Sequence, residues 1–268
     1  TCVFLSGRNL IRLARFQMPE MSGWPKLDGN LILIGELLLI AGITMMNGAD
    51  FILQGIHPEH YPPTGHLPIS SIIGPALFGG LEDTTLMVIE RVGWWLHIII
   101  VYVFINYLPK SKHLHIILAF PNTYYARINN RGEMTNMPEI MNEVKSMMGL
   151  TEAIPDADMS DEIPDFGAKD IFDLPFTTVL GAYTCTECGR CTSVCPANIT
   201  GKKLSPRKIM MDIRDRAEEI HLNISSKKTP SEGYNFTKNG YNDGKSLFDN
   251  ISKEEIRACT SCNACVEA

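Results

Sequence analysis

Seven of the eight cysteines lie in two runs whose spacing suits iron–sulfur chemistry. They are Cys185, Cys188, Cys191, Cys195, Cys259, Cys262 and Cys265. In each run three cysteines are separated by two residues, and in the first run a fourth follows after three residues and precedes Pro196. Three closely spaced thiolates wrap one face of a cubane, and a fourth cysteine followed by proline reaches the neighbouring cluster in two-cluster proteins. The spacing therefore predicts two 4Fe-4S clusters.

The same rule assigns each cysteine to a cluster. One cluster is expected to take Cys185, Cys188 and Cys191, with its last ligand just beyond residue 268. The other is expected to take Cys195 together with the three cysteines of the second run. A zinc site would need two pairs of ligands arranged as a tetrahedron. It would not explain why Cys191 and Cys195 are present in the first run. Cys2 stands alone in an apolar stretch and is expected to be a small residue facing lipid or another helix.

The first 120 residues supply the elements that must hold these cysteines at a membrane. Residues 30–47 are almost wholly apolar, and residues 86–108 form a second apolar stretch, long enough to cross most of a ~30 Å hydrocarbon core. Between them, residues 72–81 are apolar but too short to span, and Pro75 interrupts them, so they are expected at the interface. The two long stretches are predicted transmembrane helices.

Basic residues flank the two predicted spans and are missing from the loop between them. Those before the first span are Arg8, Arg12, Arg15 and Lys26, and those after the second are Lys110 and Lys112. Residues 48–85 contain no Lys or Arg. The positive-inside rule therefore predicts a multi-pass protein of the plasma (inner) membrane whose cysteine domain is cytoplasmic, where disulfides are disfavoured. A net charge of −6 gives no basic surface for nucleic acid.

The predicted fold is mainly α, with transmembrane helices followed by a helical two-cluster ferredoxin domain. Its expected parts are a membrane domain over 1–130 that is cut at its N-terminus, a Met-, Pro- and acid-rich linker over 131–170, and a helical 4Fe-4S ferredoxin-like domain over 171–268 that is cut at its C-terminus. Ser205 as N-cap and Pro206 at the first helical position begin a helix that apolar spacing carries to His221. Residues 222–250 are expected to form a loop.

Three short motifs accompany the cysteines. Residues 182–191 read AYTCTECGRC, residues 204–208 read LSPRK, and residues 258–262 read ACTSC. Over roughly residues 165–268 the chain resembles the heterodisulfide-reductase-related iron–sulfur oxidoreductases, whose members resemble the helical ferredoxin domains of succinate dehydrogenase and of the glycolate oxidase iron–sulfur subunit. Members usually carry cysteine-rich CCG repeats further on. This chain lacks them, which leaves a catalytic role of such repeats open.

Two histidines near the second predicted span are candidate haem ligands. His97 lies inside it, and His115 follows 18 residues later, which is five turns of a continuous helix. Both rings would then lie on one face about 27 Å apart, a separation that suits two haems near opposite sides of the membrane. His113 would point elsewhere. The register depends on the helix continuing past Pro109, which kinks or ends helices.

The same stretch resembles the haem b (gamma) subunit of respiratory nitrate reductase. In that family a histidine is followed by proline twelve residues on, then by a small and a basic residue, and by histidine at eighteen; the matching positions here are His97, Pro109, Ser111 with Lys112, and His115. The resemblance implies haem b bound by His97 and His115, each with a second axial histidine from another helix. The alternative is that His97 packs between helices and His115 lies at the interface. An ionisable residue inside a span favours the haem.

Other polar residues of the membrane half have simpler expected roles. Glu36 could relay a proton to or from quinone, or pack against a neighbouring helix. Arg91 lies at a different depth and is not expected to pair with Glu36. The loop histidines His57, His60 and His66 are expected to be solvated.

These observations predict an electron-transferring part of a respiratory oxidoreductase. Electrons would pass between a quinone or haem b site in the bilayer and the two clusters, and from there to or from a partner dehydrogenase or reductase subunit. One alternative is a membrane-tethered module that binds zinc or senses oxidation. Another is that the full-length protein is itself a thiol–disulfide reductase, which CCG repeats after residue 268 would indicate.

Overall fold

The computed structural model describes residues 1–65, 67–130, 133, 138–150, 167–226, 241 and 243–268. The chain divides into two compact units, Thr1–Ile116 and Ile117–Ala268. Every regular element in the described residues is a helix. The predicted fold class, mainly α with membrane-type helices followed by a helical cysteine domain, is confirmed.

The first unit contains the two longest apolar helices. Its α-helices are α1 (Cys2–Asn9), α2 (Trp24–Ile56), α3 (Ser70–Phe78) and α4 (Asp83–Tyr107). Its 3-10 turns are η1 (Ala14–Phe16), η2 (Pro19–Met21), η3 (Leu108–Lys110) and η4 (Lys112–Leu114). Helix α5 (His115–Tyr124) crosses the boundary between the units.

The second unit is built from shorter helices around one long one. Its α-helices are α6 (Pro138–Met147), α7 (Phe176–Thr184), α8 (Arg190–Ser193), α9 (Pro196–Ile199), α10 (Pro206–Ser226), α11 (Lys253–Arg257) and α12 (Ala264–Glu267). Its 3-10 turns are η5 (Ile171–Asp173) and η6 (Leu247–Asp249).

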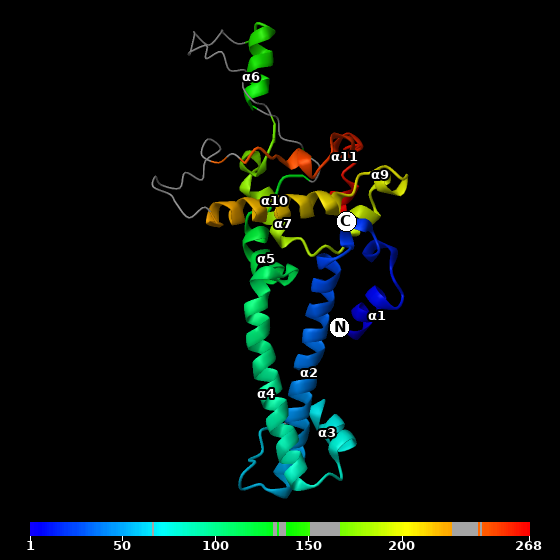
Figure 1. Ribbon diagram of the computed structural model, residues 1–268, viewed down its shortest axis with the longest axis vertical. Helices are drawn as coiled ribbons and strands as arrows, with labels where there is room; N and C mark the ends of the chain where they lie inside the picture. The colour runs from blue at the N-terminus through cyan, green and yellow to red at the C-terminus, as the bar shows by residue number, and fades with distance from the viewer. Residues whose placement is uncertain (66, 131–132, 134–137, 151–166, 227–240, 242) are drawn as a thin grey trace. The chain divides into compact units, whose positions relative to one another are not determined.

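Helices α2 and α4 are each long and apolar enough to cross a membrane, as predicted. Figure 1 shows them side by side, with α3 beside α2. Where they meet, Ala49, Leu53 and Leu86 form a buried cluster. Apolar side chains such as Val103 and Trp95 are instead exposed on the outside of the pair. An apolar outer surface of this extent favours lipid over water as its surroundings.

Glycines bring the helices of the first unit into backbone contact. Gly93 of α4 lies against Gly42 of α2, and a Cβ added at Gly93 would come within 2.6 Å of the Met46 amide nitrogen. Gly74 of α3 lies against Gly48 of α2, with 2.5 Å between its hypothetical Cβ and the Gly48 carbonyl oxygen. Small residues at these positions are how apolar helices approach closely.

The variant Gly93→Ala is therefore expected to destabilise the α2–α4 pair by about 1–3 kcal/mol, because the added methyl group must push the helices apart. Thermal unfolding in detergent, followed by circular dichroism, measures the loss. Gly55→Ala is the matched control, since a Cβ at Gly55 of α2 meets nothing within 4 Å. Equal stability of both variants and the wild type would contradict the close contact at Gly93.

A buried carboxylate joins the start of α2 to the end of α4. Asp28 is 2% exposed and accepts hydrogen bonds from the Tyr107 hydroxyl and, at 3.1 Å, from the Lys112 backbone N–H. The Lys112 ammonium group lies 3.9 Å from the Asp28 carboxylate and donates to the Pro25 carbonyl at 2.9 Å. Because it lies outside both predicted apolar runs, Asp28 carried no sequence signal for this role.

Helix α10 organises the second unit. Ile213 of α10 packs with Ala182 of α7 and with Leu247 and Ile251 to form its core. The predicted start is confirmed: Pro206 is the first helical residue, and the Ser205 hydroxyl accepts the Lys208 N–H at 3.4 Å. The helix ends at Ser226 rather than at His221, so the beginning of the predicted loop over 222–250 is helical.

A buried arginine of α10 ties distant segments together. The Arg216 side chain is 1% exposed. Its guanidinium group lies 2.7 Å from the Asp170 carboxylate, 2.7 Å from that of Asp243 and 3.0 Å from that of Glu219. Lys245 also contacts Glu219. This network fixes the segments before α7 and before η6 against α10.

Parts of the predicted linker and loop lie outside the described residues. These are residues 131–132, 134–137 and 151–166, which include most of the acidic stretch, and residues 227–240 and 242. Within the predicted linker, the structure forms helix α6.

Candidate metal centre

The first cysteine run forms a loop between α7 and α9. Cys185 follows the last residue of α7, and Cys191 lies in the short helix α8. Between them Glu187 and Gly189 adopt left-handed backbone angles, with φ of 55° and 74°. This turn directs the Glu187 N–H to the Cys185 sulfur at 3.4 Å.

The second run repeats this backbone. Ser261 and Asn263 occupy the positions equivalent to Glu187 and Gly189, with φ of 52° and 61°. The Ser261 N–H again donates to the sulfur two residues earlier, that of Cys259, at 3.4 Å. Positive φ is uncommon outside glycine, so its recurrence at both positions of both runs indicates one loop type used twice. N–H groups directed at thiolate sulfur are a feature of iron–sulfur sites.

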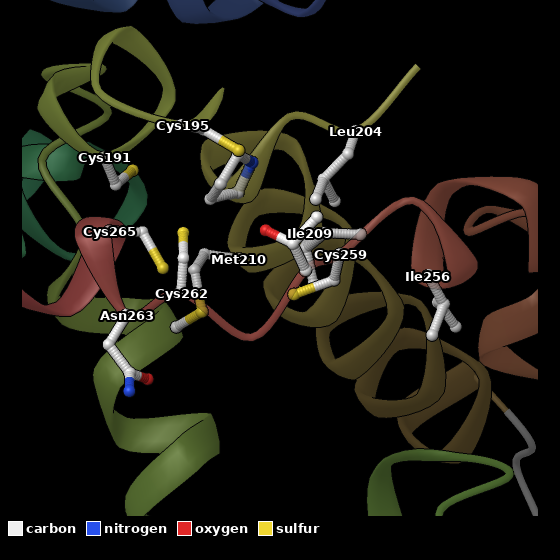
Figure 2. A pocket seen from close by; sticks show the side chains of 12 residues that line it. Cys191, Cys195, Leu204, Ile209, Met210, Ile256, Cys259, Cys262, Asn263 and Cys265 are labelled. Carbon is white, nitrogen blue, oxygen red and sulfur yellow. The ribbon is translucent and has the colours of Figure 1, made fainter. Parts of the chain in front are cut away.

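Five of the cysteines line one cavity of about 420 Å³. They are Cys191, Cys195, Cys259, Cys262 and Cys265. Figure 2 shows their side chains arriving from separate segments around one open space. Leu204, Ile209 and Ile256 give the rest of the wall an apolar character, which limits access of water. Cys195 is buried in a cluster with Leu204, and the proline that follows it begins α9.

The electrostatic contacts describe two overlapping groups of neighbouring thiols. Burial raises the pKa of the Cys185 thiol, and the Cys191 and Cys188 thiols raise it further. Burial also raises the pKa of the Cys265 thiol, as do those of Cys191, Cys195 and Cys259. Thiols that raise one another's pKa lie close together, and metal binding removes their protons outright. Cys191 takes part in both groups.

This arrangement suits clusters better than single ions. Within the part of the chain that the structure describes, no three His, Cys, Asp or Glu side chains gather closely enough to hold one metal ion. The cysteines instead surround a space of several atoms' size, whereas structural zinc requires a closed tetrahedron. Soft thiolates spread around an apolar cavity are the donor set of an iron–sulfur cluster.

Salt bridges to α10 and α11 position both loops. Glu187, buried within the first loop, accepts from Arg214 of α10 at 2.8 Å. Lys208 of α10 reaches Glu255 of α11 at 3.0 Å, and Glu255 lies four residues before Cys259, where the second run begins. Glu255 in turn caps α11 through Ser252, whose N–H it accepts at 2.7 Å. The cysteine spacing did not predict these salt bridges, because the two residues of each pair are distant in sequence.

The predicted histidine register is wrong. Helix α4 ends at Tyr107, and Pro109 lies in a 3-10 turn, so the helix is not continuous from His97 to His115. The proline ring accounts for this break, because it removes an amide donor and crowds the preceding turn. His113 does not point away from His115 either, since their ring centroids are 5.5 Å apart. Burial lowers the pKa of His113, and the nearby His115 lowers it further.

Both candidate haem ligands make an oriented hydrogen bond. Nδ1 of His97 lies 3.2 Å from the Leu39 carbonyl oxygen of α2, beside the Gly42–Gly93 contact. Nδ1 of His115 lies 2.9 Å from the Lys112 carbonyl oxygen. A carbonyl accepts, so each Nδ1 carries the proton, and the lone pair of the neutral ring is then on Nε2.

The other polar residues of the first unit have local partners. Glu36 accepts from the Thr1 hydroxyl at 2.8 Å, and Arg91 lies 3.2 Å from its neighbour Glu90. Nε2 of His57 lies 3.2 Å from the Asp83 carboxylate, so this partly exposed histidine has a side-chain partner as well as contact with solvent. His66 lies outside the described residues, and Cys2 is exposed in α1.

Comparison with known proteins agrees with the cysteine geometry. Residues 184–268 match the family model described as a 4Fe-4S dicluster domain. The match supports two 4Fe-4S clusters. No solved structure matches the chain.

Three curated proteins extend the similarity. A probable iron–sulfur-binding oxidoreductase, FadF, of Bacillus subtilis is 30% identical over 88% of this chain and 32% of its own length. An EtfAB:quinone oxidoreductase of Syntrophomonas wolfei is 24% identical over 94% of this chain and 34% of its own length. A probable membrane-anchored ferredoxin of Chromohalobacter salexigens is 27% identical over 44% of this chain and 18% of its own length. The chain thus spans about a third of the first two relatives and is similar to iron–sulfur oxidoreductases.

Proposed function

We propose that this chain is the membrane-bound electron-transfer part of a respiratory oxidoreductase, which exchanges electrons between a quinone or haem b site and two cytoplasmic 4Fe-4S clusters. The observation that carries the proposal is the doubled cysteine loop, five of whose seven cysteines line one apolar cavity. When bound, the clusters supply one-electron transfer. The chain supplies the thiolates, the N–H groups directed at sulfur and the apolar wall.

In this proposal each cysteine keeps its predicted cluster. Cys185, Cys188 and Cys191 bind one cluster, and Cys195 with Cys259, Cys262 and Cys265 binds the other. The membrane domain comprises 1–130, the linker 131–170 and the cluster domain 171–268. The basic residues around both spans support a plasma (inner) membrane location with the cluster domain in the cytoplasm.

Haem b bound through His97 and His115 is the membrane component of the proposal. The oriented Nδ1 contacts of both rings support it, because a carbonyl partner on one ring nitrogen prepares the other to bind iron. Each iron would take its second axial histidine from a helix outside this chain's described residues. The broken helix means that the two sites are set by separate elements rather than by one helical face.

Quinone and a partner redox subunit complete the proposal. The name of the Syntrophomonas relative joins EtfAB to quinone. We extend that pairing to this chain: quinone in the bilayer at one end of the electron path, and a partner dehydrogenase or reductase subunit at the other. The apolar outer faces of α2 and α4 support direct access from the bilayer.

Anaerobic spectroscopy of the membrane-extracted full-length protein tests the proposal. We expect about eight irons per chain in clusters, electron paramagnetic resonance signals after dithionite reduction, and split haem b absorption bands. Clusters without haem would leave His97 and His115 as packing residues. Colourless protein loaded with zinc would instead favour the membrane-tethered zinc-binding or redox-sensing module.

Histidine variants separate the haem claim from the cluster claim. His115→Ala is expected to remove one haem b signal and to leave the iron–sulfur signals unchanged. His113→Ala is the matched control, because its ring is adjacent to that of His115 but is not a proposed ligand. Loss of haem in both variants alike would argue against His115 as a specific axial ligand.

A further inference from the structure

The two cysteine loops share a backbone conformation but differ in what holds it. In the first loop Glu187 has a φ of 55°, and its N–H donates to the Cys185 sulfur at 3.4 Å. In the second loop Ser261 has a φ of 52°, and its N–H donates to the Cys259 sulfur at 3.4 Å. Left-handed angles at residues with side chains persist only where the surrounding structure maintains them. Each N–H is therefore directed at sulfur only while its turn is kept in place.

A buried ion pair anchors the first turn. Glu187 is 3% exposed, and its carboxylate accepts from the Arg214 guanidinium of α10 at 2.8 Å. The Arg214 side chain is 15% exposed and also lies 2.9 Å from the carboxylate of Asp215, the next residue of the helix. Since α10 contributes to the core of this unit, the pair ties the turn to a fixed part of the fold. Salt screens a buried pair of this kind much less than an exposed one.

The second turn has no equivalent anchor. Ser261 is exposed, and its side chain makes no hydrogen bond to any residue that the structure describes. The same contact between an N–H and a sulfur is thus held by the backbone and by α10 in the first loop, but by the backbone alone in the second. The side chain at this position is the difference between two otherwise similar turns.

We infer that the Glu187–Arg214 pair holds the Glu187 N–H on the Cys185 sulfur and thereby raises the reduction potential of the cluster bound by Cys185, Cys188 and Cys191. Reduction adds one electron to this cluster and makes its sulfur ligands more negative. A hydrogen bond to a more negative acceptor is stronger, so the contact stabilises the reduced cluster more than the oxidised one. Glu187 and Arg214 are positioning residues in this scheme. The inference rests on the proposed function, because it needs a cluster at this site.

Redox titration of the full-length protein, monitored by electron paramagnetic resonance, tests the inference with two variants of equal charge. Glu187→Gln keeps an oxygen that can accept from Arg214, whereas Glu187→Met has a similar shape but removes the acceptor. Because both variants lose the same negative charge, the difference between their potentials reports the position of the N–H group. The equilibrium constant for reduction of this cluster should be about fivefold lower in Glu187→Met than in Glu187→Gln, which is about 40 mV for one electron.

Ser261→Ala is the matched control at the equivalent position of the second loop. Its side chain anchors nothing that the structure describes, so both potentials should stay at their wild-type values. A third variant, Glu187→Gly, decides the case even if Glu187→Met assembles poorly. Glycine adopts positive φ without strain but does not hold the turn in place, so its potential should also lie below that of Glu187→Gln.

The possible outcomes separate this inference from the proposed function. Potentials in Glu187→Met and Glu187→Gly equal to that in Glu187→Gln would overturn the inference. A shift of the second cluster in Ser261→Ala as large as that of the first cluster in Glu187→Met would overturn it too, because the anchor would then make no difference. Absence of cluster signals from the wild-type protein would instead overturn the proposed function.

Discussion

Replacing Cys262 by alanine is expected to remove one of the two clusters, so that iron falls from about eight to about four per chain. Cys262 is one of the cysteines that line the shared cavity, and it follows the turn that directs the Ser261 N–H to Cys259. A cubane that loses one of four thiolates is exposed to water and to loss of iron. Iron analysis and electron paramagnetic resonance of the purified variant measure the change.

Two further cysteine variants make this result specific. Cys188→Ala is expected to remove the other cluster, which leaves a different residual resonance signal from that of Cys262→Ala. Cys2→Ala, which changes an exposed cysteine outside both runs, should keep about eight irons. If Cys188→Ala and Cys262→Ala gave the same residual spectrum, the division of the cysteines into two groups would be wrong.

Arg216→Met should destabilise the cluster domain by about 3–5 kcal/mol, because removing one partner of a buried ion pair leaves the others uncompensated. The substitution would leave Asp170 and Asp243 without the guanidinium that lies 2.7 Å from each. Urea unfolding of the full-length protein, followed by loss of cluster absorbance, measures the effect. Lys245→Ala is the matched control: its side chain is 57% exposed, and an exposed pair contributes less than about 1 kcal/mol.

The same network predicts how stability depends on acidity. Hydrogen bonds from Arg216 hold the pKa of Asp243 below its ordinary value. A carboxyl whose pKa is lowered by folding contributes stability above its unfolded pKa, about 3.9, and that contribution is lost as pH falls further. Wild-type unfolding should therefore become easier below about pH 4, and Arg216→Met should show a weaker acid dependence over that range.

The sequence predicted those structural features that are decided by residues close together in the chain, such as the start of a helix or an apolar run. Ser205 and Pro206 mark the start of α10, because capping and the first helical position are decided within one turn. The two apolar runs identified α2 and α4, although α2 extends well beyond residues 30–47 at both ends. Polar residues such as Gln54 continue it by bonding within the helix, here to Asp50 at 2.6 Å.

Contacts between distant residues could not be predicted in this way. The carboxylate of Asp28 is bound by Tyr107, and the guanidinium of Arg216 by Asp170 and Asp243; no spacing rule links such positions. The predicted alignment of His97 and His115 on one helical face was wrong for a related reason. It assumed that one helix continues past Pro109. Sequence patterns therefore identified the candidate ligands, whereas the buried charges required the fold.

The Arg216 network also bears on the order in which the chain can mature during synthesis. Its guanidinium binds a carboxylate 46 residues earlier and another 27 residues later. Chains fold as they emerge from the ribosome, beginning at the N-terminus. The first cysteine run is therefore exposed in the nascent chain well before Asp243 arrives to lock α10 in place. Its thiols must be kept reduced through that interval, which ties assembly of this protein to the reducing capacity of the compartment that makes it.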